Sequence, residues 1–204
     1  MHGLGADARD FHGLPAEIRL PAGLRVRYVF PNAPRIPVTI NMGLIMRAWY
    51  DVTDFDARGQ DEPRIRQSAG WIDELIAREV ERGVPAGRIV LGGFSQGGAM
   101  ALFVGLRQPA ALAGIMCLSG YLPLAATLDA EAAAESRDVP IFQAHGSVDP
   151  MVPPELAHRT RDRLEAGGYA VDYHEYAMAH QICYDEVGDI GAWLAGVLAP
   201  VTRE

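Results

Sequence analysis

Lysine is absent from this sequence: all 18 basic residues among its 204 are arginine. Schiff-base chemistry and catalysis by a lysine base are therefore excluded. The net charge is -8, and no positive patch of the kind that nucleic-acid binding needs is evident. We therefore expect no nucleic-acid partner.

Cysteine is also scarce. The two cysteines, Cys117 and Cys183, form neither a metal-ligand motif nor a redox motif. We interpret them as reduced thiols in a cytoplasmic protein.

We expect neither a targeting segment nor a membrane-spanning segment. The first residues do not combine a basic stretch with an apolar one, so no signal peptide is predicted. The uncharged run at 108–128 is long enough to cross a bilayer, but it contains Pro109, Gly114, Gly120 and Pro123. We interpret this region as the buried centre of a sheet covered on both faces, and expect no membrane insertion.

Apolar residues are plentiful: 49% of the sequence is hydrophobic and 22% is charged, which is typical of a globular protein. We expect one domain over residues 1–204, because no linker or repeat interrupts the chain. Strands are predicted at 24–30, 38–41, 89–91, 112–118, 139–144 and 170–176. Helices are predicted at 11–18, 63–82, 99–103, 155–166 and 183–198, with a surface helix or mobile cap at 125–137. This alternation predicts an α/β fold with a mostly parallel sheet.

The motif Gly-Phe-Ser-Gln-Gly at 93–97 lies between a predicted strand and a predicted helix. A tight turn there would expose the Ser95 hydroxyl, and Gly93 and Gly97 would avoid collisions with neighbouring backbone. The helix start would direct free N–H groups toward developing negative charge. In a glycine-rich chain the motif also arises by chance, but its position favours a nucleophile.

A serine nucleophile needs a base, and the base needs an orienting carboxylate. His180 follows the strand predicted at 170–176, and Asp149 follows the one at 139–144, so both lie at carboxyl ends of strands. Asp138 precedes its strand and so lies at the opposite end of the sheet. We interpret the other histidines as structural or solvated; they are His12, His158, His174, His2 and His145. The rings of His2 and His145 are expected to hold loops by hydrogen bonds. The order Ser95, Asp149, His180 is that of α/β-hydrolases.

A second donor to an oxyanion is expected from an early loop. The sequence His-Gly-Leu-Gly at 2–5 precedes the first predicted helix. We propose the backbone N–H groups of Leu4 and Gln96 as the pair, although the same four residues also suit an ordinary turn.

Several segments together resemble the phospholipase/carboxylesterase family of α/β-hydrolases, almost from end to end. They are MHGLGADxxDF at 1–11, PVTIN at 37–41, MRAWYD at 46–51, GFSQGG at 93–98, HGxxDxxVP at 145–153 and MAH at 178–180. The resemblance implies a serine esterase without metal or cofactor that acts on small esters with short or medium acyl chains. It also implies that Trp49 lies beside the acyl pocket, unless it is a core aromatic, and that Met151 and Val152 line the entrance. A homodimer is left open.

The sequence departs from this family at its start. Family members carry a hydrophobic strand just before the His-Gly-Leu-Gly loop, whereas this sequence begins at Met1. We expect a truncation, with an open slot or a shifted strand beside residues 89–93. The main functional hypothesis is a carboxylesterase. An acyl-protein thioesterase or lysophospholipase is the alternative, and an impaired homologue that only binds ligands is a third.

Overall fold

The core of the molecule is a four-stranded parallel sheet. The computed structural model describes residues 1–54 and 59–199. The strands lie in the order β3 (Val90–Phe94), β4 (Gly114–Leu118), β5 (Ile141–Gly146) and β6 (Val171–Tyr176). Every residue of β5 is buried, as expected for a central strand covered on both faces. The predicted α/β architecture and parallel sheet are confirmed.

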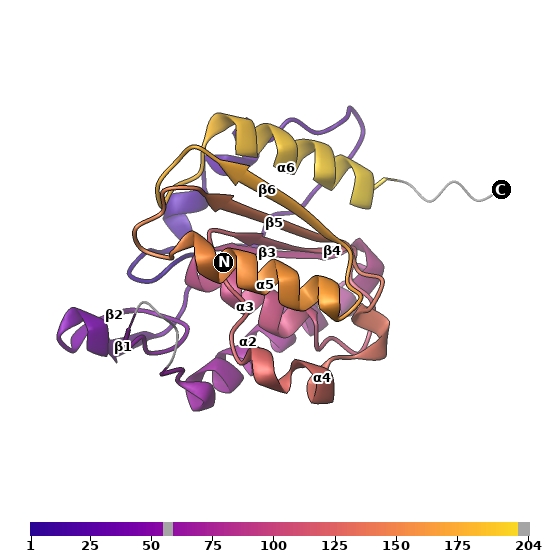
Figure 1. The fold of residues 1–204 in the computed structure, drawn as a ribbon. Coiled ribbons are helices and arrows are strands. Elements are labelled where there is room, and N and C mark those ends of the chain that lie inside the picture. The colour runs from indigo at the N-terminus through magenta and orange to yellow at the C-terminus, as the bar shows by residue number, and fades with distance from the viewer. Residues whose placement is uncertain (55–58, 200–204) are drawn as a thin grey trace.

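Helices cover both faces of the sheet (Figure 1). On one face lie α2 (Glu62–Glu81), α3 (Gln96–Gly105) and α5 (Pro154–Ala166), and on the other lies α6 (Tyr184–Val197). All ten residues of α3 are buried, which explains why its sequence is apolar all round. In the part of the chain that the structure describes, no helix is both long and apolar enough to cross a membrane.

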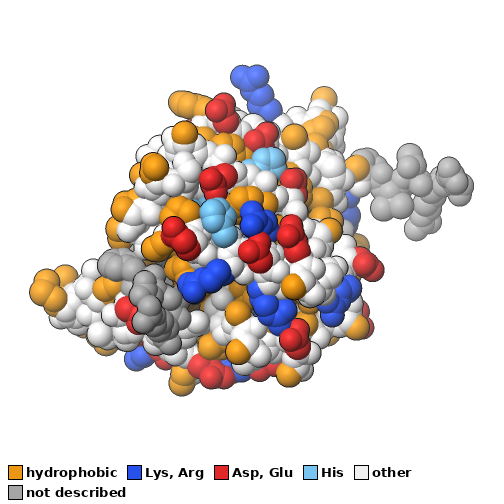
Figure 2. All heavy atoms as spheres, viewed as in Figure 1, with side chains coloured by type: hydrophobic (Ala, Val, Ile, Leu, Met, Phe, Trp, Pro, Cys, Tyr) orange, Lys and Arg blue, Asp and Glu red, His pale blue; other side chains and the backbone are white. Residues whose placement is uncertain are grey.

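A small antiparallel hairpin projects from the body of the molecule (Figure 1). It consists of β1 (Arg35–Val38) and β2 (Leu44–Arg47), and its tip exposes Met42, Leu44 and Ile45 (Figure 2). The strand predicted at 38–41 is wrong beyond Val38, because Thr39–Asn41 form a 3₁₀ turn, η2, that leads into left-handed Met42.

The remaining elements are short. They are η1 (Ala8–Phe11), α1 (Leu14–Glu17), η3 (Ala86–Arg88), η4 (Ala125–Thr127), α4 (Leu128–Glu131) and η5 (Ala134–Ser136). The helix predicted at 125–137 is therefore divided into three pieces. Its continuation is interrupted where the N–H of Ala133 and the hydroxyl of Ser136 both donate to the carbonyl of Leu106, beyond the end of α3.

The segment predicted as a strand at 24–30 does not form one. Its side chains alternate as expected, with Val26 and Tyr28 half-buried and Arg27 exposed, but it pairs with no strand in the described residues. A cavity of about 510 Å³ lies between this segment and β3. A strand needs a neighbour to satisfy its backbone, and this cavity occupies the neighbour's place.

One residue does pair with β3 on its open side. The amino nitrogen of Met1 donates to the carbonyl of Gly92 at 2.8 Å, and the N–H of Phe94 donates to the carbonyl of Met1 at 3.1 Å. Because backbone groups alternate in direction along a strand, Val90 and the N–H of Gly92 also face this side. The expected open slot beside β3 is confirmed.

Filling this slot should stabilise the protein. Six valine and isoleucine residues added directly before Met1 would bring backbone partners to Val90 and Gly92, and each new hydrogen bond contributes about 0.5–1.5 kcal/mol. We expect Tm to rise by roughly 10 °C, since each kcal/mol shifts Tm by about 2–4 °C in a domain of this size. The control is an added stretch of six alternating glycine and serine residues. Equal Tm values for the two variants would contradict this account of the slot.

A buried carboxylic acid near the start of α6 should make stability depend on pH. Glu186 is fully buried; its Oε2 accepts from the N–H of Cys183 at 3.4 Å, and its Oε1 has no partner among the described residues. Burial raises the pKa of Glu186 from 4.5 to about 7. The folded state therefore holds a proton that the unfolded state has released, so stability falls as pH rises from about 4.5 through 7.

Glu186→Gln should remove this loss. The shift corresponds to about 3 kcal/mol, so the variant should gain up to that amount over the wild type at pH 8 relative to pH 4.5. Urea unfolding at both pH values measures the difference, and any pH-independent packing change cancels. Glu135→Gln, at an exposed position, is the control. The same pH dependence in wild type and Glu186→Gln would show that Glu186 does not titrate as proposed.

Candidate active site

Ser95 occupies a strained turn between β3 and α3. Its backbone has φ 55° and ψ -122°, a region that residues with a side chain rarely adopt. The N–H of Ser95 donates to the carbonyl of Leu118 at 2.7 Å, which ties the turn to β4. The turn therefore presents Ser95 at the carboxyl end of β3, as the sequence predicts.

Two glycines allow this turn to be so tight. A Cβ atom on Gly93 would lie 2.3 Å from the backbone of Gly97, and one on Gly97 would lie 2.3 Å from the carbonyl oxygen of Met1. Gly97 thus lets the chain at Met1 and His2 pass directly against the start of α3. Any larger residue at either position would displace the turn.

The side chain of Gln96 holds the turn from the other side. Its Oε1 accepts from the N–H of Trp49 at 2.8 Å, and its Nε2 donates to the carbonyl of Tyr50 at 2.8 Å. The residue is 4% exposed, so this pair of bonds is shielded from water. Sequence reasoning assigned Gln96 only its backbone N–H; the side-chain role could not be recognised without knowing that residues 49–50 lie alongside.

The loop at residues 2–5 is fixed against Ser95. The ring of His2 is buried; its Nε2 accepts from the N–H of Ala33 at 3.0 Å, so its Nδ1 must carry the proton that it donates to the carbonyl of Gly3 at 2.7 Å. Burial lowers the pKa of His2, in keeping with a neutral ring. A Cβ atom on Gly3 would lie 3.1 Å from the Cβ of Ser95, so the loop and the turn are in direct contact.

His180 and Asp149 form a close pair. The Nδ1 of His180 lies 2.6 Å from Asp149 Oδ2, and Asp149 Oδ1 accepts from the N–H groups of Met151 at 2.8 Å and Val152 at 2.9 Å. An ionised carboxylate only accepts, so Nδ1 carries a proton, and the tautomer that fits this bond has Nε2 unprotonated. Asp149 is 3% exposed, whereas His180 is half-buried.

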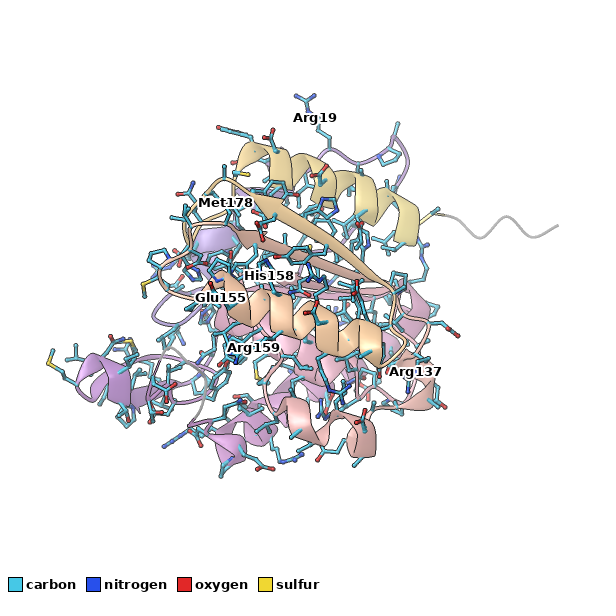
Figure 3. All side chains as sticks on the ribbon, viewed as in Figure 1. Arg19, Arg137, Glu155, His158, Arg159 and Met178 are labelled. Atoms are coloured by element: carbon cyan, nitrogen blue, oxygen red, sulfur yellow. The ribbon has the colours of Figure 1, made fainter. Side chains whose placement is uncertain are left out.

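Close backbone contact brings these two loops together. A Cβ atom on Gly146 would lie 2.4 Å from the carbonyl oxygens of Met178 and Ala179. Met178 lies in the loop after β6 (Figure 3), and its carbonyl accepts from the N–H of Val148 at 3.2 Å. Gly146 thus allows the chain before His180 to reach over the end of β5.

A cavity of about 340 Å³ joins these parts. Ser95, His180 and Leu4 all line it, and the ring of Phe94 lies 4.7 Å from that of His180. The structure therefore brings the predicted serine, histidine and oxyanion loop to one cavity, with Asp149 bonded to His180. Other lining residues, which sequence reasoning did not single out, are Gly3, Ala6, Asp10, Phe11, Gln181 and Ile182. Their positions beside residues 2–5 and His180 were the available signal.

The three predicted substrate-binding residues, Trp49, Met151 and Val152, are not among the described residues that line this cavity. Trp49 is 2% exposed, and its Nε1 donates to the carbonyl of His2 at 3.0 Å, so it is a core residue that supports the loop. Met151 and Val152 donate to Asp149, and neither is among the described residues lining the cavity. The described residues also contain no group of three histidine, cysteine or acidic side chains placed to hold a metal.

Comparison with known proteins places this geometry in context. Residues 1–198 match the family described as phospholipase/carboxylesterase. An acyl-protein thioesterase 1 from Neurospora crassa is 40% identical over 212 residues, which cover 98% of this chain and 86% of that protein.

Solved structures agree with the sequence comparison. The crystal structure of Arabidopsis thaliana SOBER1 superimposes with a TM-score of 0.92 at 28% identity, covering 97% of this chain and 96% of the other. The crystal structure of Zea mays acyl-protein thioesterase 2 gives a TM-score of 0.85 at 29% identity, covering 97% and 91%.

The bonds to Asp149 predict the effect of Asp149→Asn. Two backbone N–H groups would keep the amide oxygen on their side, so the NH₂ group would face His180. Nδ1 would then have to accept, and Nε2 would carry the proton and lose its basicity. By analogy with serine proteases, we expect Ser95 to react with a fluorophosphonate roughly 10⁴-fold more slowly. Asp138→Asn, at an exposed position, should react like the wild type. The opposite ranking of the two variants would assign the orienting carboxylate to Asp138.

Proposed function

This chain belongs to the phospholipase/carboxylesterase family, and from that premise we propose that it is a thioesterase that removes acyl groups from proteins. The family and its relatives are esterase and thioesterase hydrolases of the α/β-hydrolase superfamily. The expectation from the sequence placed carboxylic esters first. Relatives named acyl-protein thioesterase favour the alternative, in which the substrate is a thioester between an acyl chain and a protein thiol.

The proposed reaction begins with Ser95. His180 Nε2 takes the hydroxyl proton as the Ser95 oxygen attacks the thioester carbonyl carbon, and Asp149 stabilises the resulting imidazolium. The N–H groups of Leu4 and Gln96 would donate to the oxyanion of the tetrahedral intermediate. The carbon–sulfur bond then breaks, the sulfur leaves with the proton that His180 returns, and the acyl group stays on Ser95. Water, activated by His180, releases the carboxylic acid and restores the serine.

Thioester chemistry suits a site with one half-buried base. A thiol has an ordinary pKa of about 8.5, so it can depart as a thiolate. An alkoxide is a much poorer leaving group and needs the proton of His180 more strongly. The same residues can therefore cleave both bonds, and the acyl and leaving groups decide the preference.

The observation that carries the proposal is the shared cavity. Ser95 and His180 line it together, and the 2.6 Å contact between His180 Nδ1 and Asp149 leaves Nε2 as the ring nitrogen that can take the serine proton. Its other walls include Phe94, Phe11 and Ile182, which offer apolar surface to the acyl carbons next to the carbonyl.

A substrate pair tests the proposal. We would compare an S-acylated cysteine peptide with the O-acylated serine peptide of the same sequence and the same acyl chain. The account predicts a higher kcat/KM for the peptide thioester, and a loss on the order of a millionfold for Ser95→Ala on both substrates. Ser147→Ala, an exposed serine two residues from His145, should match the wild type.

Two results would contradict the proposal. A preference for the O-acylated serine peptide would restore the carboxylesterase hypothesis. Wild-type protein that is inactive on both substrates and unlabelled by a fluorophosphonate would favour the third hypothesis, an impaired homologue that only binds ligands.

A further inference from the structure

One buried histidine lies directly behind the candidate site, does not line the cavity and is not part of the His180–Asp149 pair. His145 is near the carboxyl end of β5, four residues before Asp149, and its side chain is fully buried. Its register partner on β6 is Glu175. A buried ring at this place raises the question of what it holds.

The hydrogen bonds of His145 define its tautomer. Nε2 lies 2.9 Å from the carbonyl oxygen of Val152, which can only accept, so Nε2 carries the proton and donates it. Nδ1 has no partner among the described residues, and a protonated Nδ1 there would be an unsatisfied donor. Burial lowers the pKa of His145, which agrees with a neutral ring.

The bond to Val152 reaches Asp149 in a single step. The carbonyl of Val152 accepts from His145, while the N–H of Val152 donates to Asp149 Oδ1 at 2.9 Å. Val152 is therefore held on both sides. The same Nε2 also lies 3.6 Å from Asp149 Oδ2, the oxygen that faces His180. His145 thus bonds to Val152, which holds Asp149 Oδ1, and also lies close to Asp149 Oδ2.

We infer that His145 is a positioning residue: it holds Val152 so that Asp149 keeps Oδ1 on the backbone and presents Oδ2 to His180. The role in turnover rests on the proposed function, whereas the role in geometry does not. Without the donated bond, residues 151–153 would relax and the carboxylate could rotate away from His180. A misplacement of about 1 Å in a catalytic group can cost on the order of 10²-fold in rate.

Variants at position 145 separate the donated bond from the bulk of the ring. In His145→Gln the amide nitrogen reaches about as far as Nε2 and can donate to Val152. In His145→Asn it stops near the position of Nδ1 and cannot. His145→Leu fills much of the volume without any donor, so a donor-free variant remains if Asn does not fold. His158→Leu is the control. His158 is a partly exposed residue of α5 (Figure 3), and it contacts Glu175, the register partner of His145.

Two measurements are made on every variant. The first is the downfield proton resonance of the His180 Nδ1–H bonded to Asp149, which requires no turnover. The second is the split between kcat and KM for the peptide thioester. We expect His145→Asn and His145→Leu to lose the resonance and about 10²-fold in kcat, with KM within about threefold of the wild type. His145→Gln and the control His158→Leu should keep the resonance and most of kcat.

The outcomes separate the positioning role of His145 from the proposed function. Retention of the resonance in the folded donor-free variants would overturn the inference, as would an equal loss in Gln, which would indicate ring shape rather than the donated bond. If the resonance follows the expected pattern but wild-type Ser95 is unreactive, the proposed function fails while the positioning role of His145 stands.

Discussion

The close contact between the backbone at Gly97 and that at Met1 is the constraint on which the site depends. No Cβ atom fits between them, so the loop at residues 2–5 lies against the Ser95 turn without a gap. Both proposed oxyanion donors, Leu4 and Gln96, flank this contact. The His2 ring then fixes the loop to neighbouring backbone, and the Gln96 side chain fixes the turn. The strained turn persists because these bonds over-determine it.

The parallel sheet delivers the other half of the site. Its strands end at the same edge, so the loops after β5 and β6 meet there, and Gly146 lets them approach to within van der Waals contact. Asp149 is then satisfied by two backbone N–H groups and by the Nδ1 of His180. Leu4 and His180 therefore line one cavity with Ser95 although they lie far apart in the sequence.

Local sequence pattern was enough to predict where a residue lies relative to the end of a strand and where a long helix begins and ends. Ser95, Asp149 and His180 each follow a predicted strand, and α2 has a clear helical period with capping signals. The pattern was not enough where a distant partner decides the outcome. Residues 24–30 alternate like a strand, but no strand among the described residues pairs with them. Trp49 is an aromatic residue in either location, and only its bond to His2 shows that it supports the core.

The central claim is that Ser95, the N–H groups of Leu4 and Gln96, and His180 act on one reacting centre. The most direct test is a crystal structure of the protein after reaction with a fluorophosphonate. The account predicts a phosphorus atom bonded to Ser95 Oγ, with its oxygen about 3 Å from the backbone nitrogens of both Leu4 and Gln96. A phosphonyl group on another residue, or an oxygen directed away from both nitrogens, would contradict it.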